Sequence, residues 1–390
     1  MNKVIVLGGD HYNALGIVRS FGVNGIMPYG ILTTLSKESK NNFCYLSKFW
    51  KKTWFALSDE EALSILMREF GNEVEKPVLV PSSDGMAYEL DTHYDELSEK
   101  FILPSINKKQ GEIARLMDKK NQVEWAHQLG LRTAKTWCVE LNKNLDIFYS
   151  EVVFPCIAKP VISSEGHKTD ITKCENIDQL QTLFVELSRK NYHRILIQEF
   201  LQKDYEAELF GCICENTNHI PYLFSKHVRE WPPVGGSVSC HQFLKDRALV
   251  KQAEHFLRQI RDYGYRGNID IELFVINGEL VLNEVNFRNS GDVYACFSQN
   301  VHYPVFSYRD MIGDDTSQMN TEYTTKHYAM NEATDFRHVL YKGMKLSEWL
   351  KYWRKSKDYA YWFSGDMKPV LRKYMYFLKK MICQKGSYEN

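Results

Sequence analysis

Polar and apolar residues alternate with a period of two in the stretch VLNEVNFRN, residues 281–289. Alternate side chains of a strand share a face, so a strand here places Glu284, Asn286 and Arg288 on one side. An edge strand with a solvated face is the ordinary explanation of such a pattern. An acid, an amide and an arginine on one face also suit a bound ligand, and the neighbouring sequence helps to decide between the two.

A second alternating stretch comes directly before the first. In NIDIELFVING the acids Asp270 and Glu272 alternate with apolar residues, and Asn-Gly at 277–278 is typical of a two-residue hairpin turn. The pattern therefore predicts two antiparallel strands that carry acids side by side. Facing carboxylates such as Glu272 and Glu284 repel each other unless a positive charge lies between them. A hard divalent cation supplies that charge, and Mg²⁺ usually takes one or two carboxylates together with substrate phosphates.

The first hundred residues alternate short apolar stretches with amphipathic ones, as in KVIVLGG, ALGIVRSFG, EEALSILMREF and PVLVPSSD. This rhythm predicts a parallel sheet with helices on its faces. Gly-Gly after the first strand could seat a phosphate at a helix N-terminus, but GGDHYNALG lacks the full GxGxxG spacing, which disfavours a dehydrogenase. Asp84 follows another predicted strand, at the edge where open α/β sheets bind ligands.

The pattern changes from about residue 107. KKQGEIARLMDKKNQVEWAHQLGL predicts a charged amphipathic helix, and FPCIAKPVISSEGHK and HRILIQEFLQKDYEAELFGCIC predict strands joined by loops. We therefore expect one domain at 1–106 and a second at 107–305, with a lid subdomain at about 135–200. Residues 306–390 are expected to form a basic, helical C-terminal extension.

Charge is balanced over the whole chain but not along it. The 390 residues include 49 basic and 49 acidic side chains, a balance that disfavours nucleic acid as a partner. From Arg337 to the end, 13 Lys and Arg stand against four acids, and apolar residues recur at helical spacing in MKPVLRKYMYFLKKMICQKG. Two interpretations stay open. This helix packs on the body of the protein, as most amphipathic helices do, or it lies in an anionic membrane interface.

The cysteines and the N-terminal residues favour a reduced, cytoplasmic protein. The nine cysteines contain no CxxC pair, and MNKVIVLGGDHY lacks the apolar core of a signal peptide. Cys212 and Cys214 share a strand face without a second ligand pair, so we do not expect a metal there. No stretch has the 18 or more apolar residues that span a bilayer. Peripheral contact at the inner face of the membrane, through the basic tail, is compatible with these observations.

Two lysines, a small-residue loop and the acid pair together indicate a nucleoside triphosphate site. Lys119 follows an acid, Lys159 interrupts the apolar strand PCIAKP, and the loop SSEGHKTD comes next. Each lysine alone would normally be a solvated side chain. A charge within an apolar strand needs an anionic partner, however, and a phosphate can be that partner.

With these residues identified, residues 1–305 resemble ATP-grasp ligases, and among them the carboxylate-amine ligases of the D-aspartate ligase group. The most specific part is IELFVINGELVLNEVNFR, which is similar to the family's acid, twelve-residue step and E-x-N-x-R signature. The resemblance implies an α/β fold. It would consist of an N-terminal parallel-sheet domain, an ATP-grasp fold of two α+β subdomains that clasp ATP, and the helical extension.

The resemblance also implies site residues. DKK at 118–120 and AKP at 158–160 resemble the lysine positions that hold the ATP phosphates, and IQEFL at 197–201 resembles the adenine hinge. The implied nucleotide contacts are Lys119, Lys159, Ser164, Gly166, His167, Glu199, Phe200, Leu201 and, for the ribose hydroxyls, Glu206. The implied ligands of Mg²⁺ or Mn²⁺ are Glu272, Glu284 and Asn286. Arg288 would contact the transferring phosphoryl group, and Arg229 the acyl phosphate or the acceptor substrate.

The resemblance implies a ligase that converts a carboxylate into an acyl phosphate with ATP and then transfers the acyl group to an amine or a thiol. We expect small-molecule substrates, and the joining of an amino acid to a cell-envelope or polysaccharide precursor. The covering loop departs from the family, where it is often glycine-rich, because SSEGHKTD holds the single glycine Gly166. That departure favours the alternative, a nucleotide-binding scaffold or sensor without turnover. No motif identifies the acid, the amine or an oligomeric state.

Overall fold

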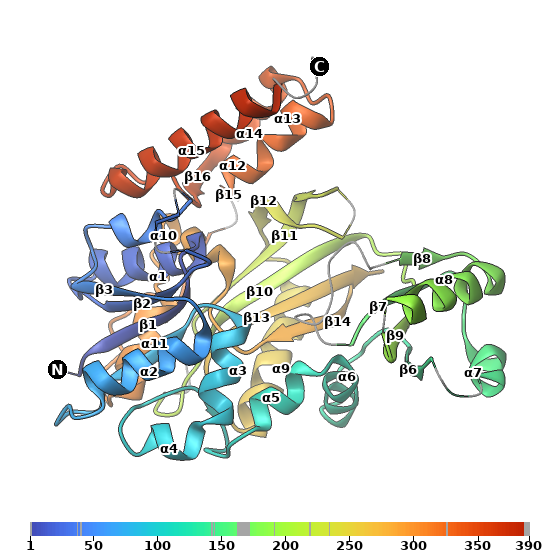
Figure 1. Ribbon diagram of the computed structural model, residues 1–390, viewed down its shortest axis with the longest axis horizontal. Helices are drawn as coiled ribbons and strands as arrows, with labels where there is room; N and C mark the ends of the chain where they lie inside the picture. The colour runs from blue at the N-terminus through green and yellow to red at the C-terminus, as the bar shows by residue number, and fades with distance from the viewer. Residues whose placement is uncertain are drawn as a thin grey trace. The chain divides into compact units, whose positions relative to one another are not determined.

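Figure 1 shows the computed structural model of the chain, in which two compact units are distinguished. Unit 1 comprises Met1–Ile113, Glu208–Asp270 and Asn286–Asn390, and unit 2 comprises Ala114–Ala207 and Ile271–Val285. The structure describes residues 2–36, 38–39, 41–141, 143, 145–161, 172–190, 192–217, 220–233, 235–324 and 327–385.

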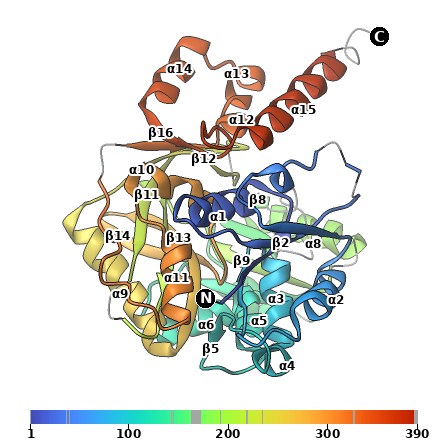
Figure 2. The same cartoon turned by 90° about the vertical axis from the view of Figure 1, so that its left-hand side faces the viewer.

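Unit 1 begins with a parallel sheet of strand order β3-β2-β1-β4. Its strands are β1 (Val4–Gly9), β2 (Tyr29–Thr33), β3 (Lys52–Ala56) and β4 (Val78–Pro81). The helices between and after them are α1 (Tyr12–Val23), the short 3-10 helix η1 (Cys44–Leu46), α2 (Asp59–Phe70), α3 (Asp84–Thr92) and α4 (Tyr94–Ser98). Figure 2 shows strand β2 of this sheet together with helices α1, α2 and α3. All four residues of β4 are buried, as expected for a strand covered on both faces. The predicted N-terminal parallel sheet is confirmed.

Local sequence explains why α2 forms at this place. The Ser58 side chain accepts a hydrogen bond from the Glu61 backbone N–H, and three acids occupy the first turn, where the helix dipole favours negative charge. Ala62, Leu66 and Phe70 recur every four residues and are buried, so the helix turns one apolar stripe to the core.

The second sheet has the strand order β14-β13-β10-β11-β12-β15-β16, in which β14 is Glu279–Asn286, and β5 pairs with β13. These strands are β5 (Ser105–Ile106), β10 (Tyr205–Ile213), β11 (Tyr222–Trp231), β12 (Ser237–Phe243), β13 (Tyr265–Ile276), β15 (Tyr328–Met330) and β16 (Ser356–Tyr359). The accompanying helices are α9 (Arg247–Tyr263), the 3-10 helix η4 (Gly291–Ala295), α10 (Cys296–Gln299) and α11 (Tyr303–Met311).

The C-terminal residues are part of unit 1. They contribute β15 and β16 to the second sheet, and four helices lie together beside these strands (Figure 1). The helices are α12 (Glu332–Asp335), α13 (Arg337–Tyr341), α14 (Leu346–Lys355) and α15 (Met367–Lys385). Within the described ranges, no helix combines the length and the apolar character that crossing a bilayer requires.

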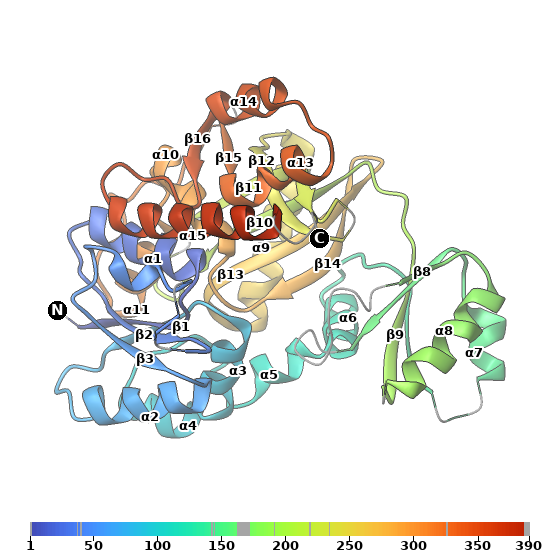
Figure 3. The ribbon, with the colours of Figure 1, turned by 45° about the horizontal axis from the view of Figure 1, so that its top comes forward.

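Unit 2 contains a four-stranded antiparallel sheet of order β6-β9-β7-β8 (Figure 3). Its strands are β6 (Thr136–Glu140), β7 (Cys156–Pro160), β8 (Thr172–Cys174) and β9 (Arg194–Glu199), and its helices include α6 (Lys119–Gln128), α7 (Asp146–Glu151) and α8 (Ile177–Arg189). Helix α5 (Glu112–Met117) leads into this unit. Leu180, Phe184 and Ile195 belong to the hydrophobic core between α8 and the sheet.

Residues Ile271–Val285 of unit 2 form the predicted hairpin between β13 and β14 (Glu279–Asn286). Asn277 and Gly278 have φ angles of 52° and 77°, and positive values at both positions are what a type I′ turn requires. The expectation that Arg288 shares a strand face with Glu284 and Asn286 was wrong. Strand β14 ends at Asn286, and Arg288 lies beyond it. The backbone N–H of Asn289 donates instead to the carbonyl oxygen of Pro81, at the end of β4 (3.4 Å), so the chain has already left the hairpin.

A buried ion pair joins the C-terminal residues to the first helix of unit 1. The Arg19 side chain on α1 is 2% exposed, and its Nε lies 3.1 Å from Asp366 Oδ2. Its other nitrogens donate to the carbonyl oxygens of Tyr361 and Asp366. The guanidinium therefore satisfies three acceptors on one short segment before α15.

We predict that Arg19→Met destabilises the protein by about 3–5 kcal/mol, because it leaves the Asp366 carboxylate buried without its counter-charge. Urea denaturation followed by circular dichroism measures the loss. Arg68→Met is the matched control, since Arg68 is 63% exposed in its pair with Glu69 and should contribute about 0–1 kcal/mol. Equal effects of the two substitutions would contradict the prediction.

Candidate active site

Two lysines of unit 2 come from different elements. Lys119 is the first residue of α6, whose N-cap Asp118 accepts hydrogen bonds from the backbone of Lys120 and Asn121. Lys159 lies in β7, paired in register with Leu196 of β9. It is only 8% exposed, and its Nζ donates to the Gln198 side-chain oxygen at 3.0 Å. The strand therefore carries a buried ammonium whose hydrogen-bond partner is a neutral amide.

Two carboxylates of the hairpin interact electrostatically with these lysines. Lys119 Nζ lies 3.3 Å from Glu284 Oε2, and Asn283 donates to Glu272 at 3.1 Å. Burial and the charge of Lys119 lower the pKa of Lys159, Glu284 and Glu272 oppose the shift, and the resulting value is about 8. The structure thus brings together four of the predicted site residues, two cations and two anions, within unit 2.

Gln122 fixes the position of α6 against the hairpin. Its side-chain nitrogen donates to the Val285 carbonyl oxygen at 2.8 Å, and its oxygen accepts from the Val285 N–H at the same distance. This reciprocal pair holds Lys119, three residues earlier on the helix, beside Glu284. Sequence reasoning missed Gln122, which reads as an ordinary polar helix residue.

The predicted adenine hinge follows β9. The Glu199 backbone N–H donates to Lys135 O at 2.9 Å, and the Phe200 N–H donates to Pro155 O at 3.0 Å. An adenine contact from Phe200 would therefore use its carbonyl oxygen. The Phe200 ring is 37% exposed beneath Lys173, and Leu201 is partly buried. The nearby Glu206 carboxylate is hydrogen-bonded to Lys203. The predicted loop residues Ser164, Gly166 and His167 lie outside the described residues.

Arg288 belongs to unit 1, where two acids hold it. Its Nε donates to Asp84 at 2.9 Å, and its Nη1 donates to Asp270 at 2.7 Å. Asn286 also reaches Asp270, with its Nδ2 3.5 Å from a carboxylate oxygen. Burial and the neighbouring Glu208 raise the pKa of Asp270 well above its usual value, and Arg288 opposes that shift. Nη2 of Arg288 takes no part in these bonds.

Sequence reasoning missed a second cluster in unit 1, centred on Glu208. His227 Nδ1 lies 2.9 Å from Glu230, its Nε2 lies 3.7 Å from Glu208, and the Ser290 hydroxyl donates to Glu208 at 2.8 Å. Burial lowers the pKa of His227, but the nearby carboxylates of Glu208 and Glu230 outweigh it and raise the value to about 10. Burial raises the pKa of Asp292, another group near Glu208, to about 6. The sequence feature that could have pointed to this cluster is the unusual density of charge in the strand SKHVREW.

Arg229 makes a two-pronged ion pair with Asp335. Its Nε and Nη2 donate to the two oxygens of that carboxylate at 2.9 and 2.8 Å, and the Tyr352 ring lies 4.2 Å from the guanidinium carbon. Asp335 is fully buried and also accepts from Ser239. These contacts tie β11 to the C-terminal helices, and only Nη1 is left outside the pair.

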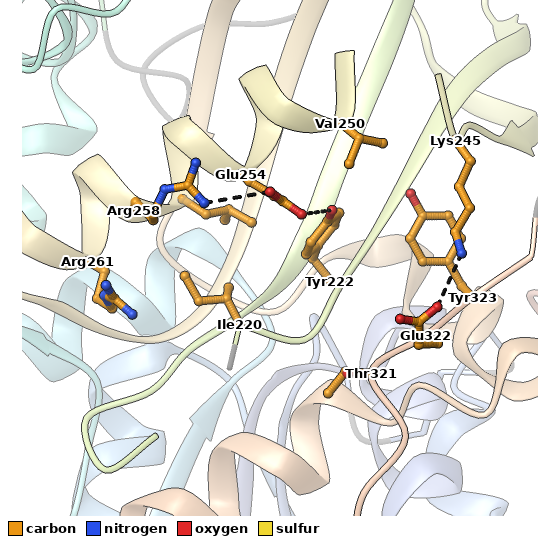
Figure 4. A pocket seen from close by; sticks show the side chains of 11 residues that line it. Ile220, Tyr222, Lys245, Val250, Glu254, Arg258, Arg261, Thr321, Glu322 and Tyr323 are labelled. Carbon is orange, nitrogen blue, oxygen red and sulfur yellow. Dashed lines mark hydrogen bonds and ion pairs between the residues drawn. The ribbon is translucent and has the colours of Figure 1, made fainter. Parts of the chain in front are cut away.

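A cavity of about 530 Å³ lies elsewhere in unit 1, and no predicted site residue lines it (Figure 4). Glu254 is paired with Tyr222 and Arg258, and Lys245 with Glu322, while Arg261 pairs with Asp262, which is not one of the lining residues. The cavity therefore has no evident connection with the residues described above.

Comparison with known proteins identifies the fold of this region. Residues 124–299 match the model of the ATP-grasp domain. The formate-dependent phosphoribosylglycinamide formyltransferase of Mannheimia haemolytica is 28% identical over 170 residues, which are 42% of this chain and 41% of the relative. The match to this relative thus spans about two fifths of its length.

Two solved structures extend the likeness to most of the chain. N5-carboxyaminoimidazole synthetase from Staphylococcus aureus has a TM-score of 0.64 at 15% identity, over 89% of this chain and 88% of that one. L-amino acid ligase from Bacillus licheniformis has a TM-score of 0.63 at 12% identity, over 84% and 78% of the two chains. At these identities the likeness establishes the fold.

The raised pKa of His227 predicts a pH dependence of stability. A folded-state pKa near 10, above the unfolded value of about 6.5, stabilises the fold fully below pH 6.5 and progressively less as the pH rises toward 10. In urea denaturation from pH 6 to pH 10, His227→Gln should therefore lose more stability relative to wild type at the acid end than at the alkaline end.

His302→Gln is the matched control for this experiment. Burial lowers the pKa of His302 to about 4, so this imidazole is neutral across the whole range. Its replacement should cost the same stability from pH 8 to pH 10 and slightly less at pH 6, where the unfolded imidazole of the wild type is protonated, so the trend is opposite to that of His227→Gln. A His227→Gln difference that does not change with pH, or that grows as the pH rises, would show that the pKa of His227 is not raised in the folded protein.

Proposed function

Because the chain contains an ATP-grasp domain, we propose that it is an ATP-dependent carboxylate-amine ligase that works through an acyl phosphate. The observation that carries the proposal is the buried Lys159 ammonium beside Lys119, Glu272 and Glu284 in unit 2. A desolvated ammonium bonded to a neutral amide is costly unless an anion completes the site, and nucleotide phosphates are anions of the right kind.

The donor set suits Mg²⁺ as well as phosphate. Glu272 and Glu284 offer carboxylate oxygens, and Asn286 offers an amide oxygen two residues after Glu284, all hard ligands of the type this ion takes. Mg²⁺ or Mn²⁺, when bound, would neutralise charge on the phosphates. We assign the phosphate contacts to Lys119 and Lys159, the base and ribose contacts to the hinge residues and Glu206, and the covering role to the loop with Ser164, Gly166 and His167.

The chemistry follows from the poor leaving group of a carboxylate. A carboxylate oxygen attacks the γ-phosphorus of ATP, the bond to the bridging oxygen breaks, and ADP leaves. The amine nitrogen then attacks the acyl carbon, and the bond between that carbon and the phosphate oxygen breaks. Phosphate leaves, and the nitrogen loses a proton. Arg288, oriented by Asp84 and Asp270, has Nη2 available to donate to the transferring phosphoryl oxygens. Arg229, anchored by Asp335, is proposed to contact the acceptor through Nη1.

We propose small-molecule substrates, with an amino acid joined to a cell-envelope or polysaccharide precursor. The basic C-terminal extension supports an acceptor that is held at an anionic membrane. ATP chemistry and the eight described cysteines, all of them free thiols, support a cytoplasmic site of action at the inner face of that membrane. A thiol acceptor would use the same acyl phosphate. A nucleotide-binding scaffold is the alternative, and the paired carboxylates and the oriented Arg288 favour turnover.

Turnover is tested by ADP release. Wild-type protein, Mg²⁺ and ATP are incubated with pools of amino acids and of sugar nucleotides, and ADP should appear only when one acid and one acceptor are both present. Glu284→Gln should abolish this release, because it removes a metal ligand. Glu186→Gln, at an exposed position on α8, is the control and should stay fully active. Nucleotide binding without ADP release in every pool would indicate the scaffold.

Nucleotide affinity should depend on the charge of Lys159. With a pKa of about 8 in the free protein, Lys159 is cationic below pH 8 and loses its charge above it, so ATP affinity should fall as the pH rises from 8 to 10. Lys159→Met should bind ATP about 10- to 100-fold more weakly at pH 7, the loss of a charge-assisted hydrogen bond, and should lose this pH dependence. Isothermal titration calorimetry measures both.

Lys143→Met is the control for this titration, because Lys143 is 66% exposed in its pair with Glu140. It should bind ATP as the wild type does at every pH. An unchanged affinity of Lys159→Met at pH 7 would remove Lys159 from the nucleotide site.

A further inference from the structure

The solvent-facing side of α15 is apolar. Leu371, Met375 and Leu378 are 55%, 53% and 56% exposed, and their spacing places them within about 60° of arc on the helix. An exposed stripe of large apolar residues is the reverse of what an ordinary surface helix shows. The flanking Lys368 and Lys379 are exposed as well, and they lie on one side of this stripe.

The opposite side of α15 is fixed to unit 1. Val370 is fully buried, Tyr374 donates to Glu332 at 2.7 Å, and Lys373 lies 4.8 Å from the centre of the Phe43 ring. The packing expected of an amphipathic helix is therefore present on this side. The stripe of Leu371, Met375 and Leu378 remains outside it, so packing against the body does not account for these three residues.

An aromatic pocket of about 350 Å³ continues the apolar surface. Tyr374 and Phe377 of α15 form one wall, and its lining is almost entirely apolar. Other lining residues are Phe336, Trp349, Trp353 and Trp362. The buried Trp349 indole N–H has no hydrogen-bond partner in the described ranges, and an occupant with an ester or amide carbonyl would supply one. Trp362 is 44% exposed, so the rim also presents an aromatic ring to solvent.

The C-terminal extension that carries this surface is strongly basic. Between residues 337 and 379 eight Lys and Arg side chains are exposed, against the single exposed acid Glu348. Asp358 and Asp366 of the same segment are buried and hydrogen-bonded within the protein. The extension therefore offers positive charge and apolar surface together, with tryptophan at the rim, and this is the combination found where proteins meet anionic lipid headgroups.

We infer that the α15 surface, defined as Lys368, Leu371, Met375, Leu378 and Lys379 with the adjoining aromatic pocket, docks on the surface of an anionic membrane. The three apolar side chains enter the headgroup region, the two lysines contact lipid phosphates, and the pocket takes the upper part of one acyl chain. A protein partner or a second copy would suit the apolar stripe, but neither accounts for the excess of positive charge around it. This inference does not depend on the ligase activity.

Vesicle flotation tests the inference on the full-length protein. Wild type should float with vesicles of equal parts phosphatidylglycerol and phosphatidylcholine at low salt, and it should stay behind with pure phosphatidylcholine or at high salt. Leu371→Glu with Met375→Glu should abolish flotation, whereas Val74→Glu, at a fully exposed position in unit 1, should not. Thermal melting of each variant verifies that it is folded, as the exposure of these side chains predicts.

The lysines and the pocket have tests of their own. Lys368→Ala with Lys379→Ala should weaken binding about 25-fold, at about fivefold for each lysine, while Lys108→Ala with Lys109→Ala should have no effect. Vesicles with bromine-labelled acyl chains should quench tryptophan emission of the wild type but not of the Leu371→Glu, Met375→Glu variant.

Two results would overturn the inference. One is a flotation result: either the wild type does not float with the anionic vesicles at low salt, or the Leu371→Glu, Met375→Glu variant still floats. The other is a dimer in light scattering that the same substitutions dissociate without any lipid binding, which would assign the stripe to a second copy of the chain. ADP release measured without lipid distinguishes either result from a failure of the proposed ligase activity.

Discussion

Unit 1 depends on arginines that are buried or largely buried and pair with carboxylates from distant parts of the chain. Arg19 pairs with Asp366 across 347 residues, Arg288 with Asp84 across 204, and Arg229 with Asp335 across 106. Removing water from a guanidinium is costly, so each pair forms only when both segments are in place. The pairs thus bind the first sheet, the second sheet and the C-terminal helices into one unit, and they orient Arg288 at the same time.

Unit 2 also contains a desolvated cation, but there the cation is not paired as the arginines of unit 1 are. Among the residues that the structure describes, no carboxylate makes a direct contact with its buried Lys159. It donates to the amide of Gln198, and its pKa is lowered by burial and by Lys119. A site in this condition gains more from an incoming phosphate than a fully paired one does, because the charge is already desolvated and positioned. The reciprocal bonds of Gln122 to the Val285 backbone hold the helix and the hairpin ready for that event.

The C-terminal extension combines packing with an exposed apolar surface. One side of α15 is committed to unit 1 through Val370 and the Tyr374–Glu332 hydrogen bond, and the other presents Leu371, Met375 and Leu378 to solvent. The packing interpretation therefore holds for one side of this helix, and membrane docking is our proposal for the other side. Burial of the first side fixes the direction in which the second side points.

The sequence by itself determined the local elements and the chemical types at the site. Period-two alternation and Asn-Gly are enough to specify the hairpin, because strand geometry and positive φ are local properties, and the βαβ rhythm specifies the parallel sheet for the same reason. Only the tertiary structure decided where β14 ends, which acids hold Arg288, that Arg229 pairs with Asp335, and that His227 lies between Glu208 and Glu230. Burial and charge pairing depend on residues far apart in the chain, and no local pattern encodes their distances.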